Sequence, residues 1–358
     1  MRFIKDKNQI YFDNAKMGPI YEELHDWKIS YEKELYEKKS SLRKGHQVFF
    51  MELKELIKRF FSSKKSEVML SNSFTSAFQK ILINLKGDLK FLCVKNDYPS
   101  ISESIKNLNY DLVELEYSNN IENELKNAIY KYKSNVLVIS IVQYIDGLKL
   151  NLDFIKELKN KNKNLLIIGD GTQYCGTEKF NFDESGFDIV ISSGYKWLHA
   201  GYGNAIVLIK NTFFKNKFLK NDKSILQKTF EAGHLDLYSF GSLKFSLAVM
   251  EKKINLISTK IKFLTKKMIH GLKKRKLLSD VKNDRLIHSS IFNISDEDGK
   301  LHSFLSKNNF IVSSRGKGCR VSLAYYNTEQ EIKLFLKVLD KFYHSTLNIE
   351  TPESELLP

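Results

Sequence analysis

Two ionisable residues, Asp170 and Lys196, follow apolar segments of the chain. Residues 165–168 form an apolar run that leads into Asp170, and residues 187–191 form a mostly apolar run that leads toward Lys196. Short apolar runs of this kind are typical of buried strands in a parallel sheet. The carboxyl ends of such strands meet at one edge of an open α/β sheet, where ligands bind. We therefore expect this carboxylate and this amine to lie together at that edge.

An acid and a lysine at a sheet edge are the groups that chemistry with pyridoxal phosphate (PLP) requires. The amine of Lys196 can form a Schiff base with the aldehyde of this cofactor, and Asp170 can partner its pyridine nitrogen. An aspartate after a strand can instead cap the next helix, and most lysines are surface residues. Lys196 stands between Tyr195 and Trp197, where an idle ammonium group is disfavoured.

The elements that must position these residues alternate along the chain. Residues 21–61 have a helical apolar stripe with a predicted break near Gly45. From about residue 67 to 210, helical patterns alternate with short apolar runs, and this predicts a mostly parallel sheet covered by helices. The runs comprise residues 68–70, 91–94, 136–139, 165–168, 189–191 and 205–209.

The pattern changes after about residue 255 and predicts a smaller α+β domain. We expect a large domain over residues 20–250, a small domain from residues 1–19 plus 251–350, and a frayed tail over residues 351–358. The predicted small-domain elements are a long basic helix at about 243–277, strands near 287–294, 309–313 and 319–324, a helix near 298–307 and a last helix from Glu329.

Composition limits the classes of partner. The formal charge of +15 would suggest nucleic acid or an acidic membrane surface. The excess is mostly lysine, arginine occurs only seven times, and the lysines are scattered, as in residues 159–163. Scattered lysines indicate a solvated face, so we expect neither nucleic acid nor a membrane as partner.

Cysteine usage and apolar stretches point to a reducing compartment. Cys93, Cys175 and Cys319 are too few and too scattered for a disulfide framework or a zinc site, and we expect no metal. An odd number of thiols suits the cytoplasm. The segment at residues 1–7 has no apolar core of a secretory signal, and no apolar stretch reaches about 18 residues, so we expect no membrane span.

The chain resembles the class V aminotransferase family of PLP enzymes, from Tyr11-Phe12-Asp13-Asn14-Ala15 to the segment at residues 319–328. That family includes cysteine desulfurases, selenocysteine lyases, kynureninases and isopenicillin N epimerase-like proteins. The resemblance implies fold type I architecture, an α/β fold with a mostly parallel sheet in a large domain and a smaller α+β C-terminal domain.

The resemblance also assigns residues to the cofactor ring. It implies that Asp170 keeps the pyridine nitrogen protonated, so that the ring can accept electrons. Gln173 matches the amide that hydrogen-bonds the phenolic oxygen, and Thr172 would lie against one face of the ring. Tyr98, in Asp97-Tyr98-Pro99-Ser100, matches the aromatic residue that stacks on the ring.

Residues 71–76 follow a strand and open an amphipathic helix, and a helix start is an anion site. The resemblance implies that the Phe74 amide and Thr75 contact the cofactor phosphate, with Ser193 as a second ligand. Tyr195 replaces the histidine that desulfurases carry, and its hydroxyl can still donate. The alternative for the Ser/Thr cluster is an ordinary capping box.

The segment at residues 230–234 indicates a second subunit. It resembles a Glu-x-Gly-Thr segment whose threonine reaches the phosphate bound to the other subunit of a dimer, and here that position is His234. The resemblance thus implies a homodimer with His234 donating across the interface. An ordinary surface loop is the alternative.

Arg320 matches the arginine that holds the substrate α-carboxylate by two parallel hydrogen bonds, and Arg315 is a second candidate. Tyr144, in a loop that lies beside the cofactor in the family, stands where desulfurases have asparagine, which argues against close desulfurase kinship. The roles of Tyr144, Arg43 and His46 in the substrate pocket stay open.

The residues favour an enzyme that acts on an amino acid or a related amine. We expect transamination first, elimination at the β- or γ-carbon second and epimerisation third. Desulfurization through an enzyme persulfide ranks low, because Cys319 abuts Arg320 and would point to the opposite face of its strand. A silent binding protein is disfavoured, since it has no reason to keep the lysine.

Overall fold

The structure is a computed structural model that describes residue 3 and residues 8–347. The tail predicted over residues 351–358 and most of the segment at residues 1–7 lie outside the described residues. The predicted domain boundaries stay a prediction. Among the described residues, no helix is long and apolar enough to cross a membrane.

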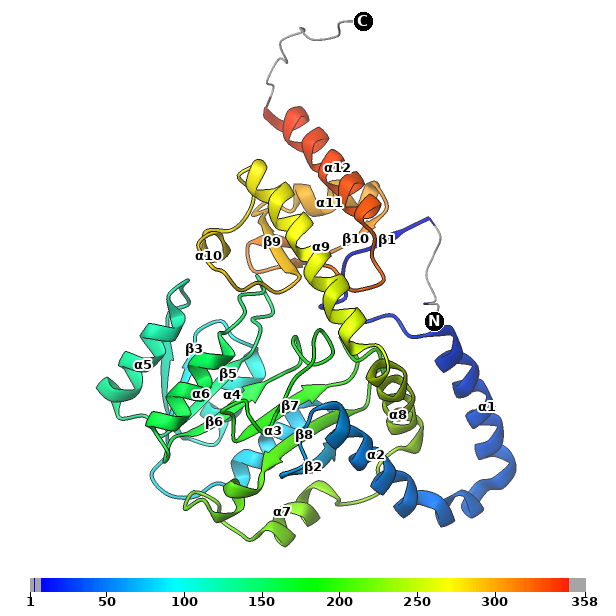
Figure 1. Cartoon of the computed structure of the whole chain (residues 1–358), viewed down its shortest axis with the longest axis vertical. Helices are drawn as coiled ribbons and strands as arrows, with labels where there is room; N and C mark the ends of the chain where they lie inside the picture. Colours follow the sequence, from blue (N-terminus) through cyan, green and yellow to red (C-terminus); the bar gives the residue numbers. More distant parts are fainter. Residues whose placement is uncertain (1–2, 4–7, 348–358) are drawn as a thin grey trace, which may run out of the picture.

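A seven-stranded sheet forms the centre of the larger part of the molecule (Figure 1). Its strand order is β2-β8-β7-β6-β5-β3-β4, and every pairing from β7 to β4 is parallel, whereas β8 runs antiparallel to both neighbours. The strands are β2 (Ser66–Ser71), β3 (Lys90–Val94), β4 (Asp111–Leu115), β5 (Val136–Ser140), β6 (Leu166–Asp170), β7 (Ile189–Ser193) and β8 (Ala205–Lys210). The predicted mostly parallel sheet is therefore confirmed.

Helices cover both faces of this sheet. Alternate strand residues enter two different apolar cores, as Ile167 and Ile168 show. One core includes α2 (His46–Phe60), α5 (Ile121–Tyr132), α6 (Leu152–Lys161) and α8 (Leu237–Glu251), and the other includes α3 (Phe74–Ile83), α4 (Pro99–Asn107) and α7 (Lys223–Phe230). The central strands are thus buried on both sides, which explains their continuous apolar runs.

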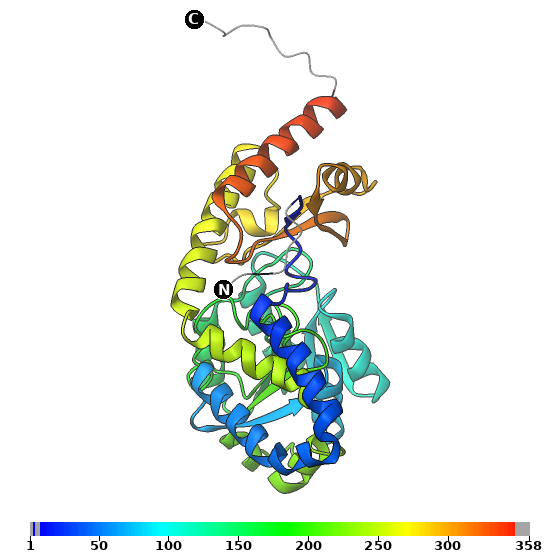
Figure 2. The same ribbon diagram turned by 90° about the vertical axis from the view of Figure 1, so that its right-hand side faces the viewer.

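The remaining elements lie at the N-terminus and around a second, smaller sheet. Helix α1 (Glu22–Lys38) and the 3-10 helix η1 (Lys39–Gly45) run along the outside of the molecule (Figures 1 and 2). The antiparallel sheet has the order β11-β12-β9, and β1 pairs in parallel with β10. These elements are β1 (Ile10–Tyr11), α9 (Ile254–Lys274), α10 (Asp280–Asn283), β9 (Ile291–Ser295), α11 (Lys300–Lys307), β10 (Phe310–Ile311), β11 (Ser313–Arg315), β12 (Gly318–Ser322) and α12 (Glu329–Leu347). The 3-10 helix η2 (Asn211–Lys215) instead follows β8 and packs in a core of the large sheet.

Two details differ from the sequence expectations. Strand β4 was not predicted, because it is an edge strand whose Asp111 and Glu114 are exposed, so it lacks a continuous apolar run. The single helix predicted over residues 243–277 is wrong, because the chain leaves helical geometry at Lys253 between α8 and α9. Helix α8 packs on the seven-stranded sheet, whereas the second half of α9 packs on the smaller sheet, so the chain must change direction between them.

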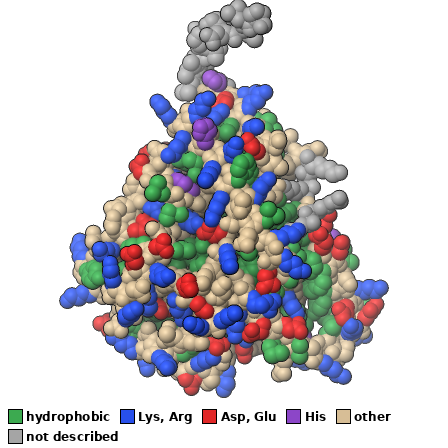
Figure 3. All heavy atoms as spheres, viewed as in Figure 1, with side chains coloured by type: hydrophobic (Ala, Val, Ile, Leu, Met, Phe, Trp, Pro, Cys, Tyr) green, Lys and Arg blue, Asp and Glu red, His purple; other side chains and the backbone are tan. Residues whose placement is uncertain are grey.

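Charged side chains are interspersed on the molecular face seen in Figure 3. Lysines and arginines stand among aspartates and glutamates there and do not gather into one basic patch. This distribution agrees with the view of the lysines as a solvating set.

Candidate active site

The carboxyl ends of neighbouring strands converge on one cavity. Ser140 at the end of β5 is the register partner of Asp170 at the end of β6, and Ser193 ends β7 beside them. The cavity is small and partly open to solvent. Its lining consists of Phe74, Tyr98, Ser140, Tyr144, Asp170, Thr172, Gln173, Ser193, Tyr195 and Lys196.

The acid and the lysine of this cavity are both buried, yet they form no ion pair. Asp170 is 6% exposed and Lys196 is 8% exposed. Burial raises the pKa of Asp170 and lowers the pKa of Lys196, since each group loses the water that would solvate its charge. Among the described residues, no carboxylate lies within 4.0 Å of Lys196, whose Nζ is 5.4 Å from the centroid of the Tyr195 ring. The amine is therefore available to a ligand.

Hydrogen bonds fix Thr172 and Gln173, which lie two and three residues after Asp170. The Thr172 amide donates to Asp170 Oδ1 at 2.8 Å, and Thr172 Oγ1 accepts from the Ser193 amide at 3.2 Å. Gln173 Oε1 accepts from Trp197 Nε1 at 2.7 Å, and Gln173 Nε2 donates to the Ala15 carbonyl at 2.8 Å. One amide hydrogen of Gln173 is thus already used, and the second remains for a ligand oxygen.

The start of α3 lies at the end of the cavity where the cofactor phosphate is expected. The Phe74 amide donates to Ser193 Oγ at 3.1 Å, which places both groups at the cavity wall. The hydroxyl of Thr75 instead donates to Ser100 at 2.8 Å, and Thr75 does not line the cavity. Burial is the main cause that raises the pKa of Tyr195 to about 12, so its hydroxyl stays protonated and can donate.

Aromatic rings close the other walls. The Tyr98 ring meets Phe74 edge to face at a centroid distance of 5.7 Å and Tyr144 at 6.2 Å. The Tyr195 ring stacks on Tyr202 at 4.7 Å. These contacts hold Tyr98 in place as a flat wall, the shape that a planar cofactor needs.

Arg320 lies behind the cavity wall and is already paired. It is 1% exposed, its Nη1 donates to the Tyr144 carbonyl at 2.8 Å, and its Nη2 lies 3.3 Å from Asp13 Oδ1. Ser313 also donates to Asp13 Oδ1, at 2.8 Å. Arg320 Nε is buried without a partner in the described part of the chain, so this edge of the guanidinium retains a free donor for a carboxylate.

The N-terminal segment ties Arg320 to the lysine loop. It contributes Asp13 to Arg320, the Ala15 carbonyl to Gln173 and the Gly18 amide to the Tyr195 carbonyl, at 2.9 Å. A Cβ atom at Gly18 would lie 1.9 Å from the backbone oxygen of Lys196, so only glycine fits this approach.

Sequence reasoning gave no role to Asp13 or to Ser140. Ser140 could have been found, because it ends an apolar run at the same sheet edge as Asp170. Asp13 had no such signal, since its partner Arg320 is 307 residues away in the chain.

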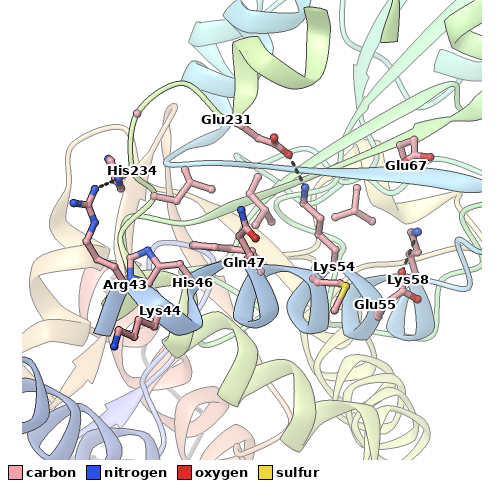
Figure 4. Close-up of a pocket in the computed structure, with 16 residues that line it drawn as sticks. Arg43, Lys44, His46, Gln47, Lys54, Glu55, Lys58, Glu67, Glu231 and His234 are labelled. Atoms are coloured by element: carbon pink, nitrogen blue, oxygen red, sulfur yellow. Dashed lines mark hydrogen bonds and ion pairs between the residues drawn. The ribbon is translucent and has the colours of Figure 1, made fainter. Parts of the chain in front are cut away.

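His234 lies away from its own cavity. It contacts Arg43 in an open groove between α2 and the segment that follows α7 (Figure 4). Lys54 and Glu231 form an ion pair across the same groove, at 2.8 Å. His234 and Arg43 therefore cannot reach the cofactor site of the same subunit from these positions, and a role for His234 at a partner's site stays a prediction.

All three cysteines are buried and carry free thiols. Cys319 lies in the apolar core beside the small sheet, on the opposite face of β12 from Arg320, as expected. Burial is the main cause that raises the pKa of each thiol to about 12. None of the three lines the cavity.

These donors fit PLP. A buried amine that has no acceptor among the described residues faces the cavity, a buried carboxylate stands at the adjacent strand end, and hydroxyl and amide donors surround the start of α3. The amine suits the aldehyde of PLP, the carboxylate suits its pyridine nitrogen, and the donors at α3 suit its phosphate.

Comparison with known proteins agrees with the geometry. The family model for aminotransferase class-V matches residues 10–335. A curated relative, a probable cysteine desulfurase of Mycoplasma genitalium, is 24% identical over 97% of this chain and 95% of its own length.

Solved structures share the fold at low identity. A cysteine desulfurase of Thermococcus onnurineus NA1 has a TM-score of 0.78 and 15% identity, with 94% of this chain and 95% of that chain covered. The cystine C-S lyase C-DES, in complex with its reaction product cysteine persulfide, has a TM-score of 0.80 and 14% identity, with 93% and 98% covered. The expected PLP fold type I architecture is confirmed.

Proposed function

Because the chain belongs to the class-V aminotransferase family and PLP is its cofactor, we propose that it is a lyase that breaks the Cβ–S bond of a sulfur-containing amino acid. Transamination was the first expectation from the sequence. The names of the curated relative and of the two structural neighbours concern carbon–sulfur chemistry, and they support the lyase better.

The observation that shapes this proposal is the burial of every thiol of the chain. A desulfurase that takes sulfur onto itself needs a thiolate at the substrate, whereas Cys93, Cys175 and Cys319 are protonated and lie outside the cavity. Elimination needs no enzyme thiol, because the sulfur leaves with the group that the substrate already carries.

The cofactor supplies an aldehyde for the lysine and an electron sink for the substrate's α-carbon. Lys196 Nζ would hold the aldehyde and then accept the α-proton, and its lowered pKa favours the neutral amine that both steps need. Asp170 would hold a proton on the pyridine nitrogen. Arg320 would bind the α-carboxylate through its free Nε edge.

For a disulfide substrate the reaction balances without an external oxidant. The Cα–H and Cβ–S bonds of cystine break, the persulfide leaves with the electron pair of the Cβ–S bond, and a proton from solvent or Lys196 completes it. Water then releases ammonia and pyruvate from the remaining three-carbon fragment.

We also propose a homodimer. Ile29, Tyr36, Val48 and Met51, on α1 and α2, expose large apolar side chains, and Met51 lines the groove that holds His234. Exposed apolar side chains gathered in one region are typical of interaction surfaces. Light scattering at micromolar concentration should give twice the mass of one chain, and an active, PLP-loaded monomer would contradict the proposal.

The function is tested by product analysis with the PLP-loaded protein. L-cystine should release ammonia and pyruvate in equal amounts, together with cysteine persulfide, while the cofactor spectrum is regenerated after each turnover. An aminotransferase would instead convert the bound cofactor to its pyridoxamine form with an amino donor alone, and a keto acid would restore it. That result would replace the lyase proposal.

Thiol alkylation provides the control for the mechanism. Iodoacetamide applied to the native, PLP-loaded protein should leave turnover unchanged, because the three cysteines are buried. Loss of turnover in step with alkylation of one cysteine would favour a desulfurase that uses its own thiol.

A further inference from the structure

The β11–β12 hairpin presents two arginines to the same side. Ser313 is the register partner of Arg320, and Ser313 Oγ donates to Asp13, which also pairs with Arg320. Side chains of directly opposed strand residues lie on one face, and residues two apart in a strand share a face. Arg315, two residues after Ser313, therefore lies on the face that carries Arg320.

Hydrogen bonds fix this hairpin against the cavity wall. Asn293 Nδ2 donates to the Ile145 carbonyl at 3.1 Å and to the Arg315 carbonyl at 3.0 Å. Arg320 Nη1 donates to the carbonyl of Tyr144, which lines the Lys196 cavity. The backbone of Arg315 is thus held one side chain away from the loop that forms the cavity wall.

Arg320 and Arg315 differ in whether a carboxylate lies beside the positive charge. Asp13 lies 3.3 Å from Arg320, whereas Arg315 has no carboxylate within 4.0 Å among the residues that the structure describes, and its Nη1 donates only to the Ser314 carbonyl, at 3.0 Å. Arg315 is also partly exposed, whereas Arg320 is buried. Arg315 is therefore an accessible cation without an acid beside it, on the hairpin that adjoins the loop of the cavity wall.

The charge of Arg315 reaches the reacting centre. Burial is the main cause that lowers the pKa of Lys196, and the positive charges of Arg320 and Arg315 lower it further. Burial also raises the pKa of Tyr144, and the charge of Arg315 opposes that rise. These effects agree with the geometry, in which Arg315 shares a strand face with Arg320 and its backbone is tied to the loop of the cavity wall.

We propose that Arg315 binds a second anionic group, carried by the substrate beyond its sulfur atom. This inference rests on the proposed lyase function and names its substrate class: cysteine S-conjugates or disulfides whose leaving fragment bears a carboxylate or another planar anion. Arg320 keeps the α-carboxylate, and Arg315 holds the leaving fragment. The planar fork of arginine matches a carboxylate with two parallel hydrogen bonds.

The test uses two ligands that differ only in the distal charge. S-carboxymethyl-L-cysteine carries a distal carboxylate, and S-carbamoylmethyl-L-cysteine carries a neutral carboxamide in its place. Each is titrated into the PLP-loaded protein while the cofactor absorbance is followed, and turnover is measured separately. The wild type should bind the carboxylate about 10- to 100-fold more tightly than the amide, the range of one charge-assisted contact. Arg315→Gln should remove that preference and leave binding of the amide unchanged.

Two variants serve as controls. Lys317→Gln removes a cation from the same hairpin, but Lys317 is exposed and pairs with Glu297 at 3.4 Å, so the preference should persist. Arg320→Lys should weaken both ligands to the same extent, because both carry the α-carboxylate. Arg315→Lys keeps the charge without the fork and should retain only part of the preference.

The outcomes separate this inference from the proposed function. Equal weakening of both ligands by Arg315→Gln, or no change with either, overturns the role of Arg315. If the wild type shows the charge preference in the titration but releases no ammonia from either ligand, the role of Arg315 stands and the lyase proposal fails.

Discussion

Two sets of buried acidic and basic residues, Asp13 with Arg320 and Asp170 with Lys196, differ in whether their charges are paired. Asp13 and Arg320 form an ion pair at 3.3 Å, and Ser313 adds a hydrogen bond to the same carboxylate oxygen. Asp170 and Lys196 are almost as deeply buried but form no ion pair. The first pair joins the N-terminal segment to the small sheet, and the second lies at the edge of the large sheet.

This difference shows which groups are reserved for a ligand. A buried charge without a partner is costly, so its pKa moves toward the neutral form. The pKa of Lys196 is lowered and that of Asp170 is raised for this reason. Burial also raises the pKa of Asp13 and lowers the pKa of Arg320, although these two groups form an ion pair. What distinguishes Asp170 and Lys196 is that their perturbed groups line a cavity and form no ion pair with each other, which is typical of a functional site. Arg320 combines both features, since one edge is paired and its Nε is free.

The largest effect is expected from Lys196→Ala, which removes the only amine that lines the cavity of the described structure. Borohydride reduction followed by peptide mass mapping should place the pyridoxyl mass on Lys196 in the wild type and nowhere in the variant. Lys282 is the internal control, because burial also lowers its pKa, to about 7, but it lies against Phe292, outside the cavity. Label on Lys282 would mean that a low pKa, not position, selects the amine.

Breaking the closed pair should mainly reduce stability. Asp13→Ala leaves the Arg320 guanidinium buried without its acid, and such changes cost about 3–5 kcal/mol. Urea unfolding of the protein without PLP measures this loss. Glu251→Ala is the matched control, because Glu251 pairs with Arg59 on the surface at 3.1 Å and should cost at most about 1 kcal/mol. Equal losses would remove the distinction between a buried and a surface pair.

Breaking the open pair should mainly reduce turnover. Asp170→Asn cannot keep the pyridine nitrogen protonated, so the rate should fall about 10²- to 10³-fold, equivalent to a few kcal/mol. The carboxamide is nearly isosteric, and removal of a buried carboxylate should not reduce stability. Steady-state turnover and urea unfolding of the same preparation measure the two effects. Near-normal turnover would contradict the role of Asp170.

The open pair could be predicted from the sequence and the closed pair could not. Asp170 and Lys196 each follow an apolar run, and the geometry of parallel strands brings such ends together. Asp13 and Arg320 meet only because β12 and the N-terminal segment lie side by side, 307 residues apart in the chain. Local patterns carry no information about such a pairing.

The limits elsewhere have similar causes. The family resemblance placed Thr75 at the cavity, but in the first turn of α3 its hydroxyl donates to Ser100 instead. The placement of His234 beside Arg43 depends on how α2 packs against the segment after α7. The break at Lys253 depends on two different cores, which periodicity within one segment cannot reveal.

The smallest predicted effect concerns pH and compares the two acids directly. The protein without cofactor captures PLP only through the neutral amine of Lys196, so the initial rate should rise with pH and level off below the ordinary lysine pKa of about 10.4. The negative charge of Asp170 favours the ammonium form, so Asp170→Asn should move the midpoint to lower pH. Asp13, which pairs with Arg320, acts on Lys196 in the same direction but more weakly. Asp13→Asn should thus shift the midpoint less than Asp170→Asn does.

Stopped-flow absorbance, with each variant normalised to its own plateau, measures both shifts. A midpoint that rises in Asp170→Asn, or one that moves equally in both variants, would show that the two carboxylates are not distinguished by their pairing.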